Sequence, residues 1–342
     1  MNALFLDGPQ KIRLGYLPEP IAEQNEILLK ISAVGICGSD LHYYREGGIG
    51  ADKIIRPFVP GHEFSGRLVG DSEESGLSAG QLVAVDPALP CGKCEWCLQG
   101  HPNLCPNVVF TGAPPFNGAM TEFISVNLAQ IFPIPENLNA ADAALLETLG
   151  IAIHAMNLAK PRPRESICIL GCGPIGLCLV QLAQEAGVEK IYAVDPLFYR
   201  AQLAKQLGAE KIDVHPEAVA DWTHGRGVDL VIEATNSMSG FQHAAKVVRI
   251  GGHIILVGIP DGDSYNITAS LLRRKGLTIK FARRMGHVYP KAIDLVRNSS
   301  VDLSCIASHA FTLETAKEAF EKQANYDDGI IKSVIYPHGE DN

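Results

Sequence analysis

The sequence lacks the long apolar runs that membrane-spanning helices need, which are about 18 residues or more. Its first residues have neither the basic start nor the apolar core of a secretory signal peptide. Basic residues are in the minority, since 38 Asp and Glu outnumber 29 Lys and Arg and give a formal net charge of −9. Because nucleic-acid phosphates bind clustered Lys and Arg, this balance argues against a nucleic-acid partner. These absences predict a cytoplasmic protein that binds neither membranes nor nucleic acid.

The composition is that of an ordinary globular protein, with 46% hydrophobic and 20% charged residues. At 342 residues the chain is long enough for two domains. It contains nine cysteines, and four of them lie close together at Cys91, Cys94, Cys97 and Cys105. In a large chain without a secretory signal, such a cluster is more often metal-binding than disulfide-bonded.

The first half of the chain is predicted to be rich in β-strands. Short apolar or alternating runs are separated by Gly and Pro, as expected of strands joined by turns and loops. These runs are Glu26–Val34, Glu63–Val69, Gln81–Val85 and Met120–Val126.

Near residue 150 the pattern changes to an alternation of helices and short buried strands. The predicted strands are Ser166–Leu170, Lys190–Val194, Val228–Ala234 and, after a turn at Gly251-Gly252, Ile254–Val257. The predicted helices are Ala140–Leu158, a segment ending near Ala186, Arg200–Leu207 and Phe241–Val248. This alternation is typical of βαβ units whose parallel sheet is covered on both faces. The end of the chain is mixed, with predicted helices Pro290–Asn298 and Leu313–Gln323 and a predicted strand Ile331–Ile335.

The four clustered cysteines have the spacing C-x2-C-x2-C-x7-C. Four thiolates this close can form a tetrahedron around Zn²⁺, and four sulfur ligands leave no open position for a substrate. The spacing therefore predicts a structural zinc site at these residues. Free or disulfide-bonded cysteines are the alternative.

A second group of metal-ligand types consists of Cys37 and, further along, His62 and Glu63. Cys, His and Glu all bind zinc, and three protein ligands plus a water molecule define a catalytic zinc site. Taken singly, each residue is unremarkable, because a lone Cys is usually a small buried side chain. Residue chemistry alone leaves the metal role of this group open.

A third pattern, Gly171-Cys172-Gly173-Pro174-Ile175-Gly176, follows a predicted strand and begins a predicted helix. Glycines at these positions permit a tight turn and a close approach of the backbone to a pyrophosphate at the helix N-terminus. Asp195 ends the next strand, at the distance expected of the acidic residue that binds the adenosine ribose. A carboxylate there repels a 2′-phosphate and so favours NAD over NADP. Arg200 either flanks the adenine or is an ordinary surface residue.

Taken together, these residues resemble the zinc-containing medium-chain dehydrogenase family, and within it the sorbitol (L-iditol) and xylitol dehydrogenase branch. The resemblance covers nearly the whole chain. It rests on Gly-Ile-Cys-Gly-Ser-Asp-Leu-His at 35–42, Gly-His-Glu at 61–63, the four cysteines, the glycine-rich pattern, and Leu-Glu-Thr-Leu-Gly-Ile-Ala-Ile-His at 146–154.

This resemblance implies an α/β protein in which a GroES-like β-rich catalytic domain is combined with a Rossmann domain, a doubly wound parallel sheet. The catalytic domain would comprise residues 1–150 and 285–342, and the Rossmann domain residues 151–284. The resemblance also implies two zinc ions per chain. The catalytic one would be bound by Cys37 and His62, with Glu63 and Glu147 as ligands or holders of the zinc-bound water.

Two departures from the branch affect the pocket. Thr148 stands where the branch usually has Pro after the glutamate, and Arg283-Arg284-Met285 stands where it has Phe-Arg-Tyr. If the alignment is right, Arg284 is the arginine on the substrate side, with a basic surface patch as the alternative. Tyr43 and Tyr44 resemble the aromatic pair that lines a polyol pocket, with core packing as the alternative.

The implied activity is oxidation of a secondary alcohol of a sugar polyol to the ketose, with NAD as hydride acceptor. In the family, zinc lowers the pKa of the substrate hydroxyl. Ser39 would take the hydroxyl proton and pass it through the ribose to His42 at the surface. Another alcohol as substrate (threonine, butanediol, or a sugar acid such as idonate or galactonate) and a catalytically silent NAD-binding protein are the alternatives. By analogy the chain is expected to form a homo-oligomer, a tetramer or a dimer.

Overall fold

The computed structural model describes residues 1–74 and 76–339. The chain divides into two units. The first contains residues 1–147, residues 289–299 and the chain from Leu303 onwards, and the second contains residues 148–288 and 300–302. Helix α3 (Ala140–Ala159) spans the boundary between them.

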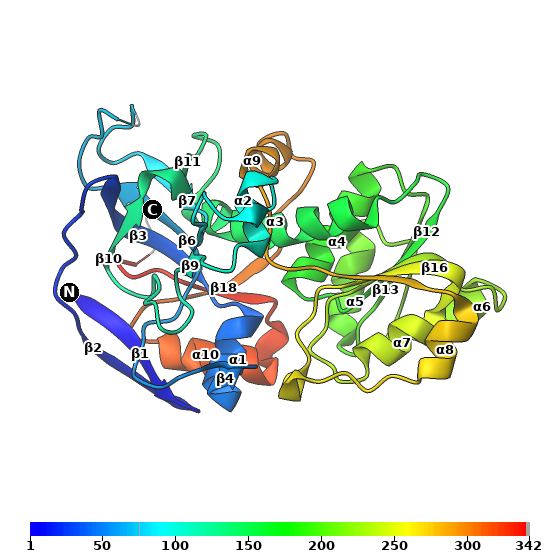
Figure 1. The fold of residues 1–342 in the computed structure, drawn as a ribbon. Coiled ribbons are helices and arrows are strands. Elements are labelled where there is room, and N and C mark those ends of the chain that lie inside the picture. The colour runs from blue at the N-terminus through cyan, green and yellow to red at the C-terminus, as the bar shows by residue number, and fades with distance from the viewer. Residues whose placement is uncertain (75, 340–342) are drawn as a thin grey trace. The chain divides into compact units, whose positions relative to one another are not determined.

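A seven-stranded sheet forms the centre of the first unit, with the order β11-β7-β6-β3-β19-β18 and β10 also paired to β3 (Figure 1). Its strands are β3 (Glu26–Gly35), β6 (Glu63–Leu68), β7 (Leu82–Val85), β10 (Phe123–Asn127), β11 (Ile131–Pro133), β18 (Ala307–Phe311) and β19 (Lys332–Ile335). Along β3 the side chains of Ile27, Leu29 and Ile31 are buried while the residues between them are more exposed. This period of two is that of a strand with one face on a hydrophobic core.

Helices and short strands complete the first unit. They are the hairpin β1 (Asn2–Gly8) and β2 (Lys11–Tyr16), the strand pairs β4 (Gly48–Ile49) with β5 (Asp52–Lys53) and β8 (Ala88–Leu89) with β9 (Val109–Phe110), and the helices α1 (Gly38–Glu46), α2 (Glu95–Leu98), α9 (Tyr289–Arg297) and α10 (Ala316–Asn325). Tyr289, the first residue of α9, is buried, and its hydroxyl donates a hydrogen bond to the carbonyl oxygen of Val85 at 2.7 Å. The segment after the second unit is thereby tied to the central sheet.

The second unit is built on a six-stranded sheet with the order β14-β13-β12-β15-β16-β17, and every pair in it is parallel. Its strands are β12 (Ser166–Leu170), β13 (Lys190–Val194), β14 (Lys211–Asp213), β15 (Val228–Glu233), β16 (Val248–Leu256) and β17 (Thr278–Phe281). Its main helices are α4 (Pro174–Glu185), α5 (Phe198–Gln206), α6 (Ala218–Trp222), α7 (Gly240–Val247) and α8 (Ala269–Lys275). If the six strands are numbered 1 to 6 from β12 to β17, their order across the sheet is 3-2-1-4-5-6, which is the order of dinucleotide-binding folds. The predicted fold class is confirmed.

The clearest difference from the sequence-based prediction lies in β16. The expected turn at Gly251-Gly252 is part of this strand, which begins at Val248. Its pairing with β15 shifts register near Gly251, whose φ of +67° an L-residue rarely adopts. A glycine in this conformation allows a bulge, so the strand continues where the sequence suggested an interruption.

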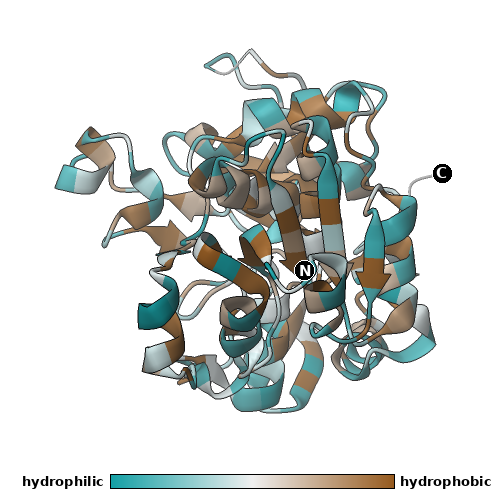
Figure 2. Ribbon diagram, turned by 90° about the vertical axis from the view of Figure 1, so that its right-hand side faces the viewer, coloured by the Kyte–Doolittle hydropathy of each residue, from teal (hydrophilic) through white to brown (hydrophobic). Residues whose placement is uncertain are grey.

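Hydrophobic and hydrophilic segments alternate along the strands and helices, as Figure 2 shows. This is the distribution of elements with one face toward a core and another toward solvent. Among residues 1–74 and 76–339, no helix is long and apolar enough to cross a membrane.

Asp229, on β15, is a carboxylate held by several donors. It accepts hydrogen bonds from the backbone N–H and the hydroxyl of Ser166 at 2.9 and 2.8 Å, from Arg226 at 2.7 Å and from Arg249 at 2.6 Å. Burial raises the pKa of Asp229, but these hydrogen bonds outweigh burial and hold the pKa well below its usual range. The ionised form is therefore favoured in the folded chain.

Replacing Asp229 with asparagine is expected to lower the free energy of unfolding by about 1–3 kcal/mol at neutral pH. Since the folded-state pKa is depressed, this stabilisation is complete above the unfolded pKa of about 4 and is lost as the pH falls toward the folded value. Urea denaturation at neutral and acidic pH measures the difference. Asp294→Asn, which breaks an exposed pair with Arg297, is the control and should cost less than about 1 kcal/mol. If Asp229→Asn lowered the free energy of unfolding as much at acidic pH as at neutral pH, the prediction would be wrong.

Candidate active site and metal centres

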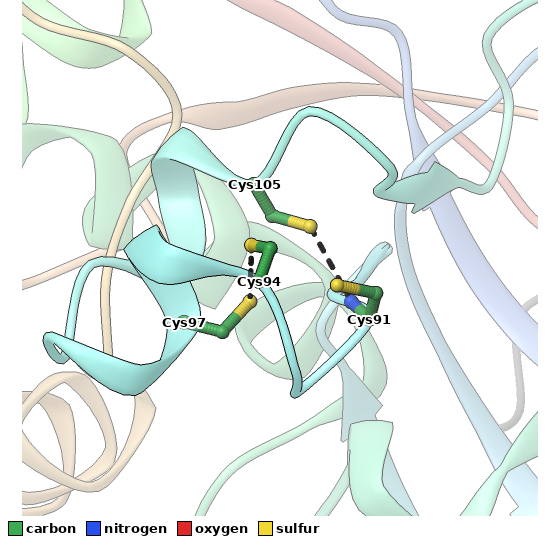
Figure 3. Close-up of side chains that lie close together, drawn as sticks. All are labelled: Cys91, Cys94, Cys97 and Cys105. Atoms are coloured by element: carbon green, nitrogen blue, oxygen red, sulfur yellow. Dashed lines mark hydrogen bonds between the residues drawn. The ribbon is translucent and has the colours of Figure 1, made fainter.

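Four cysteine side chains converge in a lobe of the first unit (Figure 3). Cys94 precedes helix α2 and Cys97 lies within it, and their Sγ atoms are 3.4 Å apart. The backbone N–H of Cys91 donates to Sγ of Cys105 at 3.4 Å. All four sulfur atoms lie within 4.8 Å of one another. A tetrahedron with Zn–S bonds of about 2.3 Å requires S–S distances of about 3.8 Å, so the lobe fits a zinc ion.

The acidity of these thiols also fits a bound cation. Hydrogen bonds led by the backbone of Lys93 lower the pKa of Cys91 to about 6. Desolvation and a hydrogen bond with Cys94 raise the pKa of Cys97 to about 12. One thiolate forms readily, whereas desolvation and hydrogen bonding keep the Cys97 thiol protonated. A divalent cation removes this penalty and holds all four as thiolates.

A second cluster of possible metal ligands lies where the inner strand β6 of the central sheet begins. Cys37 precedes helix α1, and Glu63, directly after His62, is the first residue of β6. The ligand atoms of these three residues lie within 4.8 Å of one another. Burial and the charge of Glu63 raise the pKa of the Cys37 thiol to about 12. A zinc ion supplies the positive charge that such a thiol needs in order to ionise, so the three residues fit a metal site.

Two further side chains hold this cluster in place. The buried carboxylate of Asp40 accepts the backbone N–H groups of Cys37 at 2.9 Å and Gly61 at 3.3 Å, and lies 3.8 Å from Nδ1 of His62. Lys332, on β19, is only 2% exposed, and its Nζ lies 2.6 and 2.5 Å from the two carboxylate oxygens of Glu63. Partners of this kind orient metal ligands and tune their charge. Sequence reasoning missed both residues, although a lysine within the apolar run Ile-Ile-Lys-Ser-Val-Ile was a visible signal.

Glu147 lies beside this cluster on helix α3 and is 4% exposed. Burial raises its pKa well above the usual value, while the nearby charge of His62 lowers it and that of Glu63 raises it. Glu147 is not one of the three residues whose ligand atoms lie within 4.8 Å of one another. Its role as a ligand or as a holder of the zinc-bound water stays a prediction.

Helix α1 carries four more of the residues predicted for the reaction and the pocket. Ser39 hydrogen-bonds the thiol of Cys37, which places its hydroxyl at the cluster. His42 was expected at the surface but is 7% exposed, because α1 packs this side chain inward. Its Nδ1 lies 3.2 Å from Oε1 of Glu46, whose side chain is more exposed. Glu46, which the sequence analysis did not consider, therefore connects His42 to solvent.

Tyr43 and Tyr44 are both buried in the hydrophobic core of the first unit. The ring of Tyr43 packs edge-on against Phe58, with centroids 5.4 Å apart, and Tyr44 packs against Phe320 at 5.5 Å. Both rings therefore have a packing role, and a contact with substrate stays a prediction.

The glycine-rich loop connects β12 to α4. Gly171 has a φ of +90°, and a Cβ atom on it would lie 2.7 Å from the carbonyl oxygen of Ala234. A Cβ on Gly176 would lie 1.9 Å from the carbonyl oxygen of Gly171. Gly173 is the N-cap of α4, and Pro174 and Ile175 form its first turn. Gly171 and Gly176 therefore require glycine for the tight turn, which is the geometry that brings a phosphate to a helix N-terminus.

Asp195 follows β13 and closes this region. Its carboxylate accepts the backbone N–H of Cys172 at 2.7 Å and that of Leu197 at 2.8 Å. Arg200, on α5, is buried, and its Nη1 lies 3.7 Å from the position of a Cβ on Gly173. Both predicted cofactor residues thus lie next to the glycine-rich loop. Arg284 has a φ of +51° and belongs to the second unit, after β17.

Comparison with known proteins gives a consistent result. Residues 23–136 match the family model "Alcohol dehydrogenase GroES-like domain", and residues 174–298 match "Zinc-binding dehydrogenase". Sorbitol dehydrogenase of Bacillus subtilis is 34% identical over 99% of this chain and 98% of its own length. The chain belongs to the zinc-dependent medium-chain alcohol dehydrogenase family, in its sorbitol and xylitol dehydrogenase branch.

Two further proteins are similar to this chain over nearly its full length. D-xylulose reductase of Saccharomyces cerevisiae is 31% identical over 98% of this chain and 97% of its own length. A crystal structure described as a short chain alcohol dehydrogenase from Escherichia coli, complexed with cofactor NADH, has a TM-score of 0.88 and 25% identity, covering 98% of this chain and 99% of that one. The chain is thus a zinc-dependent oxidoreductase of this family.

Proposed function

We propose that this dehydrogenase oxidises a secondary hydroxyl of a sugar polyol to the ketose and transfers the hydride to NAD. The observation that carries the proposal is the buried cluster of Cys37, His62 and Glu63 with a further carboxylate, Glu147, beside it. This is a carboxylate-rich zinc site rather than a closed thiolate site. The similarity to a sorbitol dehydrogenase over almost the full length of both chains supports the choice of substrate class.

The cluster residues each have a task in this reaction. Cys37, His62 and Glu63 would hold zinc, and Glu147 would be a further ligand or hold a water molecule on it. When bound, zinc acts as a Lewis acid that lowers the pKa of the substrate hydroxyl. The hydroxyl of Ser39 accepts the proton released from the substrate. His42 receives it, and Glu46 connects the imidazole to solvent.

The cofactor site is proposed at the glycine-rich loop. Gly171, Gly173, Pro174, Ile175 and Gly176 would bind the pyrophosphate. Asp195 would accept hydrogen bonds from the adenosine ribose and repel a 2′-phosphate, and Arg200 would flank the adenine. This arrangement favours NAD over NADP.

The substrate pocket is proposed to include Tyr43, Tyr44 and Arg284. A sugar acid would need a cation for its carboxylate, and Arg284 would supply one, so idonate or galactonate is the second candidate. Threonine and butanediol require the same metal chemistry. A catalytically silent protein would need no set of buried zinc ligands.

The two zinc ions should differ in how easily they are removed. The catalytic ion would have a single thiolate ligand and an open position, whereas the structural ion has four thiolates. Mild chelation with EDTA is therefore expected to remove one zinc per chain, with loss of activity but retention of the fold. Metal analysis after timed dialysis, with circular dichroism in parallel, measures this. Simultaneous loss of both ions would contradict it.

We also infer a cytoplasmic location and a homo-oligomer, a tetramer or a dimer. The nine cysteines all lie in the part of the chain that the structure describes and none is in a disulfide, which suits a reducing compartment. Strand β17 lies at the edge of its sheet, a position at which another chain can pair with it. Analytical ultracentrifugation of the zinc-loaded protein measures the assembly.

The test of function is NADH formation, followed at 340 nm, with a panel of alcohols. The panel contains sorbitol, xylitol, L-iditol, galactitol, 2,3-butanediol, L-threonine and sugar acids, each with NAD and with NADP. A high kcat/KM on a polyol with NAD alone is expected. Activity only on threonine or an acid would overturn the substrate class and leave the metal chemistry in place. A zinc-loaded protein inactive on every alcohol would overturn the proposed function.

A further inference from the structure

Glu233 is a buried carboxylate at the carboxyl end of β15, and neither the metal sites nor the loop residues named above include it. It is 1% exposed. Its Oε1 accepts hydrogen bonds from both the backbone N–H of Thr235, at 2.9 Å, and the Thr235 hydroxyl. A Cβ on Gly240, the first residue of α7, would lie 2.4 Å from the same oxygen. The carboxylate is therefore enclosed by the loop that joins β15 to α7.

Thr235 connects this carboxylate to the glycine-rich loop. A Cβ on Gly171 would lie 2.8 Å from Cγ2 of Thr235, so the threonine methyl group packs directly against the first glycine of the loop. The backbone N–H of Ala234 also donates to the carbonyl oxygen of Leu170 at 2.8 Å. Glu233 holds Thr235, and Thr235 forms one wall of the turn at Gly171.

The same group of residues reaches the loop after β16. A Cβ on Gly258 would lie 1.8 Å from the carbonyl oxygen of Thr235, so the two segments are in close contact. The hydroxyl of Tyr265 donates to the carbonyl oxygen of Gly258 at 2.9 Å. Three segments at the carboxyl end of the sheet therefore meet around Thr235. In folds of this strand order, that end of the sheet is where a dinucleotide binds.

The charge of Glu233 is costly for the folded chain. Burial raises its pKa to about 7, although hydrogen bonds from Thr235 and from the backbone of Gly258 lower it. No charged partner contributes to this pKa. Tyr265 is a titratable neighbour, and its own pKa is raised by burial and by Glu233, so it stays neutral near pH 7. A glutamate in this environment reduces stability when ionised, because the folded state binds the proton more tightly than the unfolded state.

We propose that Glu233 is a positioning residue for NAD binding, whose carboxylate holds Thr235 against Gly171 and so keeps the glycine-rich loop in the shape that receives the pyrophosphate. The inference rests on the proposed cofactor site. Protonation of Glu233 removes one hydrogen-bond acceptor from its carboxyl group and adds an O–H donor. The N–H and hydroxyl of Thr235 already act as donors to this group. The loop is then held less firmly, and the affinity for NAD(H) falls. The ionised Glu233 thus lowers the stability of the folded chain but keeps the cofactor site ordered.

The test measures the Kd of NADH by its fluorescence on the full-length, zinc-loaded protein between about pH 6 and pH 8.5. In the wild type, binding is expected to weaken as the pH falls through about 7. Glu233→Gln is expected to raise the Kd about tenfold at about pH 8 and to remove most of this pH dependence. Without NADH, the variant should melt at the same temperature as the wild type or higher at pH 8, because it carries no buried charge. A purely structural role would instead lower the melting temperature.

Asp229→Asn is the matched control, since Asp229 lies at the opposite end of the same strand. It should lower stability and leave the Kd of NADH unchanged. Thr235→Val should weaken NADH binding as Glu233→Gln does, and the double variant should be no worse than either. If Glu233→Gln and the wild type bound NADH equally well across the pH range, the role of Glu233 would be overturned, and the proposed cofactor site would not be affected. Failure of the wild type to bind NADH would overturn the cofactor site as well.

Discussion

Replacing Cys37 with alanine is expected to lower kcat/KM for a polyol by at least about a thousandfold, which corresponds to about 4 kcal/mol of transition-state stabilisation. The variant loses the thiolate of a three-residue cluster and with it most of the affinity for the catalytic zinc. Zinc content should fall from two ions per chain to one, while the four-cysteine lobe keeps its ion. Steady-state kinetics and metal analysis of the same preparation measure both effects.

Cys168→Ala is the matched control for this prediction. Cys168 is fully buried in β12 and belongs to neither metal cluster. This variant should retain both zinc ions and its activity, with a modest loss of stability from the smaller side chain. If Cys37→Ala kept two zinc ions and near-normal turnover, the assignment of the catalytic cluster would be wrong.

Replacing Lys332 with methionine is expected to lower the free energy of unfolding by about 3–5 kcal/mol in the zinc-free protein. The reason is that Glu63 would keep its buried charge and lose the ammonium group that contacts both of its oxygens. The loss should be smaller in the zinc-loaded protein, where the metal charge partly replaces that of the lysine. Urea denaturation with and without zinc measures the difference.

Two variants separate the unpaired charge from the loss of packing. Adding Glu63→Gln to Lys332→Met removes the stranded charge, so the double variant should recover much of the stability. Lys322→Met breaks exposed ion pairs with Glu318 and Asp328 and should cost less than about 1 kcal/mol. A double variant no more stable than Lys332→Met would show that packing, not charge, dominates.

The parts of this protein that depend on local sequence were predictable. The four cysteines lie within one short segment, and the glycine-rich loop lies directly between its strand and its helix, so spacing alone indicated both. The four inner strands of the parallel sheet were predictable because they are covered on both faces and mostly apolar. The two edge strands, β14 and β17, contain charged residues and were not predicted. Gly251 misled the prediction because a glycine can mark a turn or a bulge with equal ease.

The supporting residues of the catalytic cluster were not predictable in the same way. Lys332 contacts Glu63 across 269 positions of sequence, and the pair forms only because β19 is added beside β3. Asp40 was visible between two residues of interest, but only the fold shows its carboxylate close to the His62 ring. Contacts of this range depend on topology, which residue spacing does not encode.

The late position of β19 in the chain has a consequence for biosynthesis. Its Ser333 accepts, through the carbonyl oxygen, the backbone N–H of Ile36 at 3.0 Å, and Gln323 bridges the same two segments. A nascent chain therefore presents the complete four-cysteine lobe long before the ribosome releases the strand that carries Lys332. The structural ion can be captured during synthesis, whereas the catalytic cluster gains its buried lysine only after β19 has been made and has paired with β3.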